Sequence, residues 1–169
     1  HTLYQAYRRA DEGPYPAIAQ ADPHHPIVLA LRPNSTLERY SELADIVMAY
    51  SEPVPRSPLT AVADSVQAAR EAVGSTKPVW AVIQATGYRW ISELSPTPRP
   101  DGRPPTAAEH RAMVYIALMA GADGVVSHAW GLPAIGGRGS YYIPRDQPEL
   151  WAGMVETNRQ LDWLAPALL

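Results

Sequence analysis

The stretch KPVWAVIQATGYRW, residues 77–90, decides the fold. Its first half contains a short, almost continuously apolar run, residues 79–83, which is typical of a strand buried on both faces. The run stops at Gln84 and passes into a cluster of polar and aromatic residues that a simple turn does not need. Such a strand end favours a ligand site at the carboxyl edge of a parallel sheet.

Three similar apolar runs occur elsewhere in the chain and alternate with helical patterns. Serine or threonine followed three residues later by glutamate predicts the start of two helices, and proline after serine predicts the start of another. We therefore predict an α/β fold of parallel (β/α) units covered by helices. The predicted strands are residues 26–31, 45–50, 79–83 and 124–128, and the predicted helices are residues 35–43, 57–74, 106–121 and a last one from about Pro148.

The connections between these elements differ in length. Each helix leads to the next strand through three or four residues, whereas two strand-to-helix connections, residues 86–105 and 129–147, are long. Both are rich in proline, glycine, arginine and aromatic residues. Long connections of this kind are usually functional, and in α/β folds they gather where ligands bind.

Composition narrows the function classes. The chain has 169 residues, of which 14 are basic and 17 acidic, and like charges form no run. We therefore expect neither nucleic acid nor a membrane surface as a partner, and no apolar stretch approaches the roughly 20 residues of a membrane span. There is no cysteine. The chain starts at a histidine, from which we expect a fragment or processed piece whose natural N-terminus lies elsewhere.

Five segments in order carry a resemblance to a known family. They are ADPHHP (21–26), ADIVMAYSEPVP (44–55), KPVWAVIQATG (77–87), PTAAEHRAMVYIALMAGADGVV (105–126) and NRQLDWLAPALL (158–169). Together they resemble the second half of the TIM-barrel catalytic domain in a group of bacterial glycoside-hydrolase-like proteins. The resemblance implies that residues 1–169 are one partial domain, strands five to eight of a (β/α)8 barrel. A whole barrel needs about 250 residues.

The resemblance also implies positions for catalytic residues. The nucleophile of related retaining glycosidases is a glutamate at the end of strand seven, where this chain has Gln84. An amide binds a sugar hydroxyl but cannot form the glycosyl ester. The acid/base lies in an Asn-Glu-Pro or Asp-Glu-Pro turn, which the sequence DEGP matches loosely, with Glu12 as the acid. The alternative is a solvated turn between two helical pieces, residues 3–10 and 17–21.

Other candidates lie at the ends of the remaining strands. Tyr50 and Glu52 follow the second strand, where the family tends to have an aspartate and a tyrosine, and Glu52 is the best carboxylate on the site face, unless it is only a solvated loop residue. His128 and Trp130 follow the fourth strand; a histidine there is often structural, and Trp130 is interpreted as facing sugar.

Aromatic rings and guanidinium groups suit sugar rings and their hydroxyls. The long loops supply Arg89, Trp90, Arg103, Tyr141 and Tyr142 for this role, although Trp90 is equally well explained as closing the barrel top. The remaining tryptophans are interpreted as packing residues; they are Trp80, Trp151 and Trp163.

Three hypotheses follow. The chain belongs to a glycoside hydrolase acting on O-glycosidic bonds of an oligo- or polysaccharide, to a binding barrel that lost its nucleophile, or to a structural half-barrel that self-associates. We expect either self-association or a missing N-terminal half. We expect no cofactor. We also expect no metal, because a metal site needs a second ligand at a definite spacing, and His24 and His25 lie in a helix-to-strand turn on the opposite face. The location is extracellular or periplasmic if the natural N-terminus carries a signal peptide, and otherwise undetermined.

Overall fold

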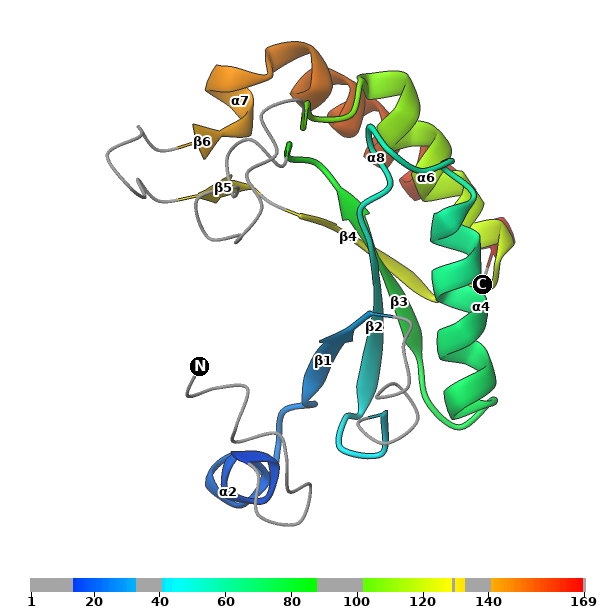
Figure 1. The fold of residues 1–169 in the computed structure, drawn as a ribbon. Coiled ribbons are helices and arrows are strands. Elements are labelled where there is room, and N and C mark those ends of the chain that lie inside the picture. The colour runs from blue at the N-terminus through cyan, green and yellow to red at the C-terminus, as the bar shows by residue number, and fades with distance from the viewer. Residues whose placement is uncertain (1–13, 33–40, 88–101, 129, 133–140, 169) are drawn as a thin grey trace.

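A single parallel sheet organises the computed structural model, which describes residues 14–32, 41–87, 102–128, 130–132 and 141–168 (Figure 1). Its strands are β1 (Val28–Leu31), β2 (Ile46–Ser51), β3 (Val79–Gln84) and β4 (Gly124–His128). They are paired in chain order, and every pair is parallel. The predicted α/β class and all four predicted strands are confirmed, with bounds that differ by at most two residues.

Helices cover one face of this sheet, on the right in Figure 1. Helix α4 (Ala61–Val73) packs on β2 and β3, and α6 (Ala107–Met119) packs on β3 and β4. The long C-terminal helix α8 (Pro148–Leu168) packs on α6, and α2 (Pro14–Ala21) precedes β1. The core between sheet and helices is formed by alternate residues of the strands and the apolar faces of α4 and α6; it includes Val47, Ala49, Val79, Ala81, Ile83, Val62, Val66, Ala69, Met113, Val114 and Ala117.

Helix starts were predicted with mixed success. The capping box before α6 is confirmed, because Thr106 accepts a hydrogen bond from the Glu109 N–H and the Glu109 side chain accepts one from the Thr106 N–H. The predicted start at Ser57 is wrong. Its N–H donates to Pro53 O in a turn, at 2.7 Å, and α4 begins only at Ala61. The helix predicted from Ser35 falls mostly on residues outside the described ranges.

The amino edge of the sheet contains the same aspartate clamp twice. The Asp45 N–H donates to Ile27 O at 2.8 Å, and Asp45 Oδ2 accepts from the Ile27 N–H at 2.7 Å. Asp123 repeats this with Val79, at 2.7 and 2.8 Å, and Asp123 also pairs with Arg70 of α4. Each clamp fixes the start of one strand against the residue that leads into its neighbour, so the two clamps set the register of β1 with β2 and of β3 with β4.

The face of the sheet that carries no helix has partly exposed apolar residues. Val28 at one edge strand and Val126 at the other are 36% and 37% exposed. Between them, the half-buried Trp80 ring lies over Gly124, where an added Cβ would meet it at 2.9 Å. Trp80 therefore packs as predicted, but Trp163 on α8 does not, since it is 81% exposed.

The long connection after β4 has structure of its own. A two-stranded antiparallel ladder joins β5 (Gly131–Leu132) to β6 (Tyr141–Tyr142), and a short helix, α7 (Ile143–Asp146), leads to α8. This part lies above the carboxyl ends of the strands in Figure 1. Apolar residues hold it there in a second small core of Ala85, Tyr141, Ile143, Leu150 and Met154.

Candidate functional site

Three polar side chains lie in one row at the carboxyl edge of the sheet. Gln84 at the end of β3 is paired with His128 at the end of β4, and Ser51 is paired with Ile83, so Glu52 is level with Gln84. Side chains alternate between the two faces of a strand. Because Ile83 packs against the helices, this row projects from the face that carries no helix.

Glu52 is the centre of a charged cluster. Its side chain is only 2% exposed, and its carboxylate lies 3.3 Å from Arg32 Nη2 and 3.7 Å from His128 Nδ1. Arg32 follows β1, so the cluster draws on three strand ends. Two cationic or potentially cationic groups at this range stabilise a carboxylate anion.

Tyr50 joins the cluster from two residues earlier on β2. Its hydroxyl lies 3.4 Å from His128 Nδ1, and its ring meets the imidazole edge to face with centroids 5.6 Å apart. The Arg32 guanidinium carbon lies 4.6 Å from the centre of the Tyr50 ring, within cation–π range. Sequence reasoning proposed Tyr50, Glu52 and His128 separately, and the structure brings all three together.

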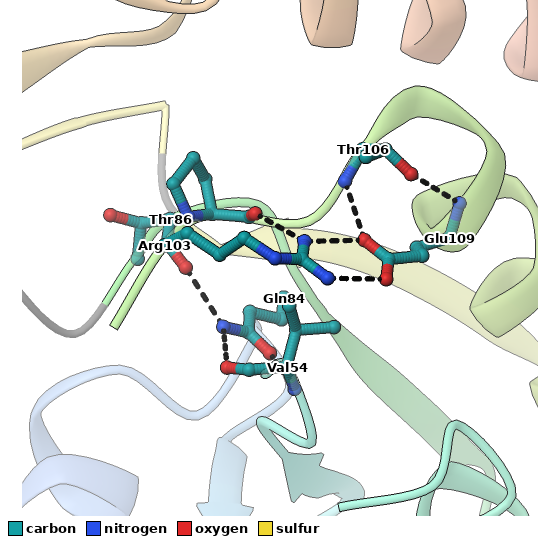
Figure 2. A network of polar contacts seen from close by, with 7 residues as sticks. Val54, Gln84, Thr86, Arg103, Thr106 and Glu109 are labelled. Atoms are coloured by element: carbon teal, nitrogen blue, oxygen red, sulfur yellow. Dashed lines mark hydrogen bonds and ion pairs between the residues drawn. The ribbon is translucent and has the colours of Figure 1, made fainter. Parts of the chain in front are cut away.

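The side-chain amide of Gln84, in contrast, is hydrogen-bonded to backbone groups (Figure 2). It is 1% exposed. Its Oε1 accepts from the Val54 N–H at 2.9 Å, and its Nε2 donates to Val54 O at 3.0 Å and to Thr86 O at 2.9 Å. Both amide protons are thus used within the fold, and they hold the segment after β2 against the end of β3.

A second carboxylate near this edge, that of Glu109, also has a structural role. Glu109 forms two hydrogen bonds with Arg103, both 2.7 Å, beside Gln84 in the view of Figure 2. The Arg103 guanidinium is the main reason that the pKa of Glu109 falls from 4.5 to about 2. The interpretation of Arg103 as a sugar-binding residue therefore meets a competing role, which is to tie the chain before α6 to the first turn of that helix.

The aromatic residues after β4 divide into exposed and buried ones. Trp130 is 53% exposed and meets Tyr142 and Trp151 edge to face, with centroids 5.1 and 4.9 Å apart. Tyr141 is 2% exposed, donates to Ala85 O at 3.1 Å, and has its pKa raised to about 12, mainly by burial. Interpreting Tyr141 as a sugar-facing residue is therefore wrong. Its neighbour Tyr142 is 38% exposed.

Glu12, Arg89 and Trp90 lie outside the described residues, and their proposed roles stay predictions. Arg32 is the residue that sequence reasoning missed. Its position directly after the first apolar run could have indicated it, because the carboxyl ends of parallel strands meet at one edge.

Neither a metal cluster nor a membrane span is found in the part of the chain that the structure describes. Among these residues, no three histidine, cysteine or acidic side chains gather as metal ligands would. His25, near the amino edge, contacts Asp22 at 2.9 Å. The described helices include none long and apolar enough to cross a membrane.

Comparisons with known proteins add no relative. No model of a known protein family matches the chain, and a search of curated proteins finds no match. The site has to be interpreted from its own geometry.

Proposed function

We propose that this chain is part of a carbohydrate-active (β/α) barrel, with its sugar site at the carboxyl edge around Glu52. One observation carries the proposal: Tyr50, Glu52 and His128 converge there, from separate strands, on the face without helices. A carboxylate, a phenol and an imidazole can hydrogen-bond sugar hydroxyls. Hydrolysis through an oxocarbenium-like transition state requires negative charge in the site, and Glu52 supplies it next to His128.

The barrel part of the proposal rests on strand order and on exposure. Four parallel strands paired in chain order, with helices on one face, support the proposal, because consecutive strands of a (β/α)8 barrel are parallel neighbours with helices outside. Edge strands with partly exposed apolar residues, Val28 and Val126, are a liability that soluble proteins cover. We infer that a second copy of the chain or an N-terminal half of the barrel covers them.

Light scattering over a concentration series tests this inference. The chain alone should dimerise or aggregate as its concentration rises. A well-folded monomer at every concentration would rule out the half-barrel.

Gln84 supports a second candidate, a sugar-binding protein without hydrolytic activity. The resemblance puts a nucleophilic glutamate at this position, and here the amide is used by Val54 and Thr86. A retaining mechanism through residue 84 is excluded by its chemistry.

Substitution at Glu52 distinguishes the two candidates. The parent, Glu52→Gln and the control Glu71→Gln, which changes an exposed carboxylate on α4, should be assayed on a panel of aryl glycosides, with binding measured by calorimetry. For a hydrolase, Glu52→Gln should lower kcat by about 100-fold or more and leave binding nearly intact, while the control has parental activity. Binding without turnover by the parent favours the second candidate, and neither binding nor turnover on any sugar removes the carbohydrate proposal.

A further inference from the structure

The charged cluster combines one buried group, the Glu52 carboxylate, with two more accessible groups, Arg32 and His128. The side chain of Glu52 is 2% exposed, whereas that of His128 is 38% exposed. A ligand in the site would therefore meet the imidazole before the carboxylate. The group that exchanges a proton with a ligand has to be within hydrogen-bond reach of it.

The two imidazole nitrogens of His128 have different surroundings. Nδ1 is the nitrogen near the protein groups, 3.7 Å from Glu52 Oε1 and 3.4 Å from the Tyr50 hydroxyl. Among the described residues, none makes a hydrogen bond to Nε2. A carboxylate beside one ring nitrogen favours the proton on that nitrogen and leaves the lone pair on the other.

The hydrogen bonds of Gln84 explain why the side chains of Glu52 and His128 can approach each other. Glu52 and His128 belong to strands on either side of β3, two strand spacings apart, or about 9.6 Å. The side chain between them in the row is Gln84, whose amide is hydrogen-bonded to the backbone of Val54 and Thr86. Among the described residues its amide bonds to neither Glu52 nor His128, whose side chains approach to 3.7 Å across its position.

We propose that His128 exchanges the proton with the ligand through Nε2, and that Glu52 and Tyr50 are positioning residues that hold Nδ1 inward. The kinetic part of this proposal rests on the hydrolytic function proposed above. In hydrolysis of an aryl glycoside, Nε2 takes a proton from water while the water oxygen bonds to the anomeric carbon. The aryl oxygen leaves with the electron pair of the glycosidic bond, and the imidazolium gives its proton to solvent. Glu52 stabilises the imidazolium charge in between.

The protonation pattern of the ring tests the proposal without any substrate. Long-range ¹H–¹⁵N correlation spectra of the protein labelled at its five histidines distinguish a protonated Nδ1 from a protonated Nε2, and His128→Gln assigns the signal. In the parent, neutral His128 should carry its proton on Nδ1. In Glu52→Gln this preference should be lost or reversed, and Glu52→Asp should restore part of it.

A matched control comes from the other edge of the sheet. His25 Nδ1 lies 2.9 Å from both carboxylate oxygens of Asp22 at an exposed position. Asp22→Asn should change the signals of His25 and leave those of His128 unchanged. A proton on Nε2 of His128 in the parent, or a pattern that Glu52→Gln does not alter, would overturn the proposal.

Kinetics add a second readout if the parent hydrolyses a glycoside. His128→Gln should lower kcat by about 100-fold or more with little change in KM. Because Glu52 acts through the same ring, the double variant should be no slower than His128→Gln alone. Additive losses would show that Glu52 and His128 act independently. If the parent is inactive and binds no sugar, the proposed function fails while the spectra still decide the position of the proton.

Discussion

Glu52 and Gln84 are neighbours in one row of side chains, yet the protein uses them in different ways. Gln84 is enclosed by backbone groups and satisfies one N–H and two carbonyl oxygens. Glu52 is enclosed by side chains, with Arg32 and His128 at 3.3 and 3.7 Å. An amide suits the first position because it both donates and accepts, and a carboxylate, which only accepts, suits the second. The contrast separates a polar group bonded to the backbone from one bonded to other side chains at the same edge.

Replacing the Gln84 amide with a carboxylate tests this difference most strongly, because it should cause the largest loss of stability. Gln84→Glu removes both donors and puts an anion beside Val54 O and Thr86 O in a site that is 1% exposed. We expect unfolding to become easier by roughly 3–5 kcal/mol, or the carboxyl to stay protonated. Chemical denaturation at pH 7 measures this.

Glu52→Gln is the matched comparison for that experiment. Its partner Arg32 is 57% exposed and can be solvated, so the loss should be no more than about 1 kcal/mol. Equal losses in the two variants would remove the distinction between the two positions.

The next largest effect on stability is expected at His110, a buried polar side chain on the helix side of the sheet. This α6 side chain is 2% exposed, with Nε2 3.0 Å from Ser127 Oγ, and burial lowers its pKa from 6.5 to about 4. The folded protein holds it neutral at pH values where the unfolded chain has already bound a proton. Stability should therefore fall as the pH drops from about 6.5 to 4, by roughly 3 kcal/mol.

Denaturation curves measured at several pH values between 7 and 4 check this expectation. The variant His110→Gln should lose less stability across that range than the parent. Parallel pH profiles for the two proteins would show that this histidine contributes nothing to acid sensitivity.

Glu109 should give a smaller effect in a separate pH window. Its lowered pKa, about 2, means that it stabilises the fold above pH 4.5 and that this contribution is lost as the pH falls towards 2. Because Arg103 is 48% exposed, solvent screens the pair, and Glu109→Gln should cost only about 1 kcal/mol at pH 7. Thermal melts at pH 7 and pH 3 should differ less for this variant than for the parent.

Trp130→Ala should have the smallest effect on stability. The ring is 53% exposed, and its described ring contacts are edge-to-face pairs with Tyr142 and Trp151. If it faces sugar, oligosaccharide affinity should fall while the melting temperature changes by a few degrees at most. Calorimetry and a melting curve measure the two quantities. A large drop in melting temperature with unchanged affinity would assign Trp130 to packing, together with the buried Tyr141.

The sequence predicted the sheet well because its signals are local. Short apolar runs located all four strands, and the capping box located α6. The start of α4 was missed because the Ser57 N–H is used by a turn at Pro53, which no residue pattern announces. Strand ends also predicted that Tyr50, Glu52 and His128 share an edge. Whether a side chain turns to the site or to the backbone, as at Glu52 and Gln84, depends on contacts between distant segments.

The paired aspartate clamps have a consequence for how such a protein can change over generations. Asp45 and Asp123 fix strand register from the amino edge, through bonds to Ile27 and Val79. The candidate site lies at the other end of the same strands. Insertions, deletions and exchanges at the carboxyl edge therefore leave the bonds that align the strands untouched. A lineage carrying this scaffold can acquire new specificity there with little penalty to folding, provided that the two aspartates and the buried Gln84 are retained.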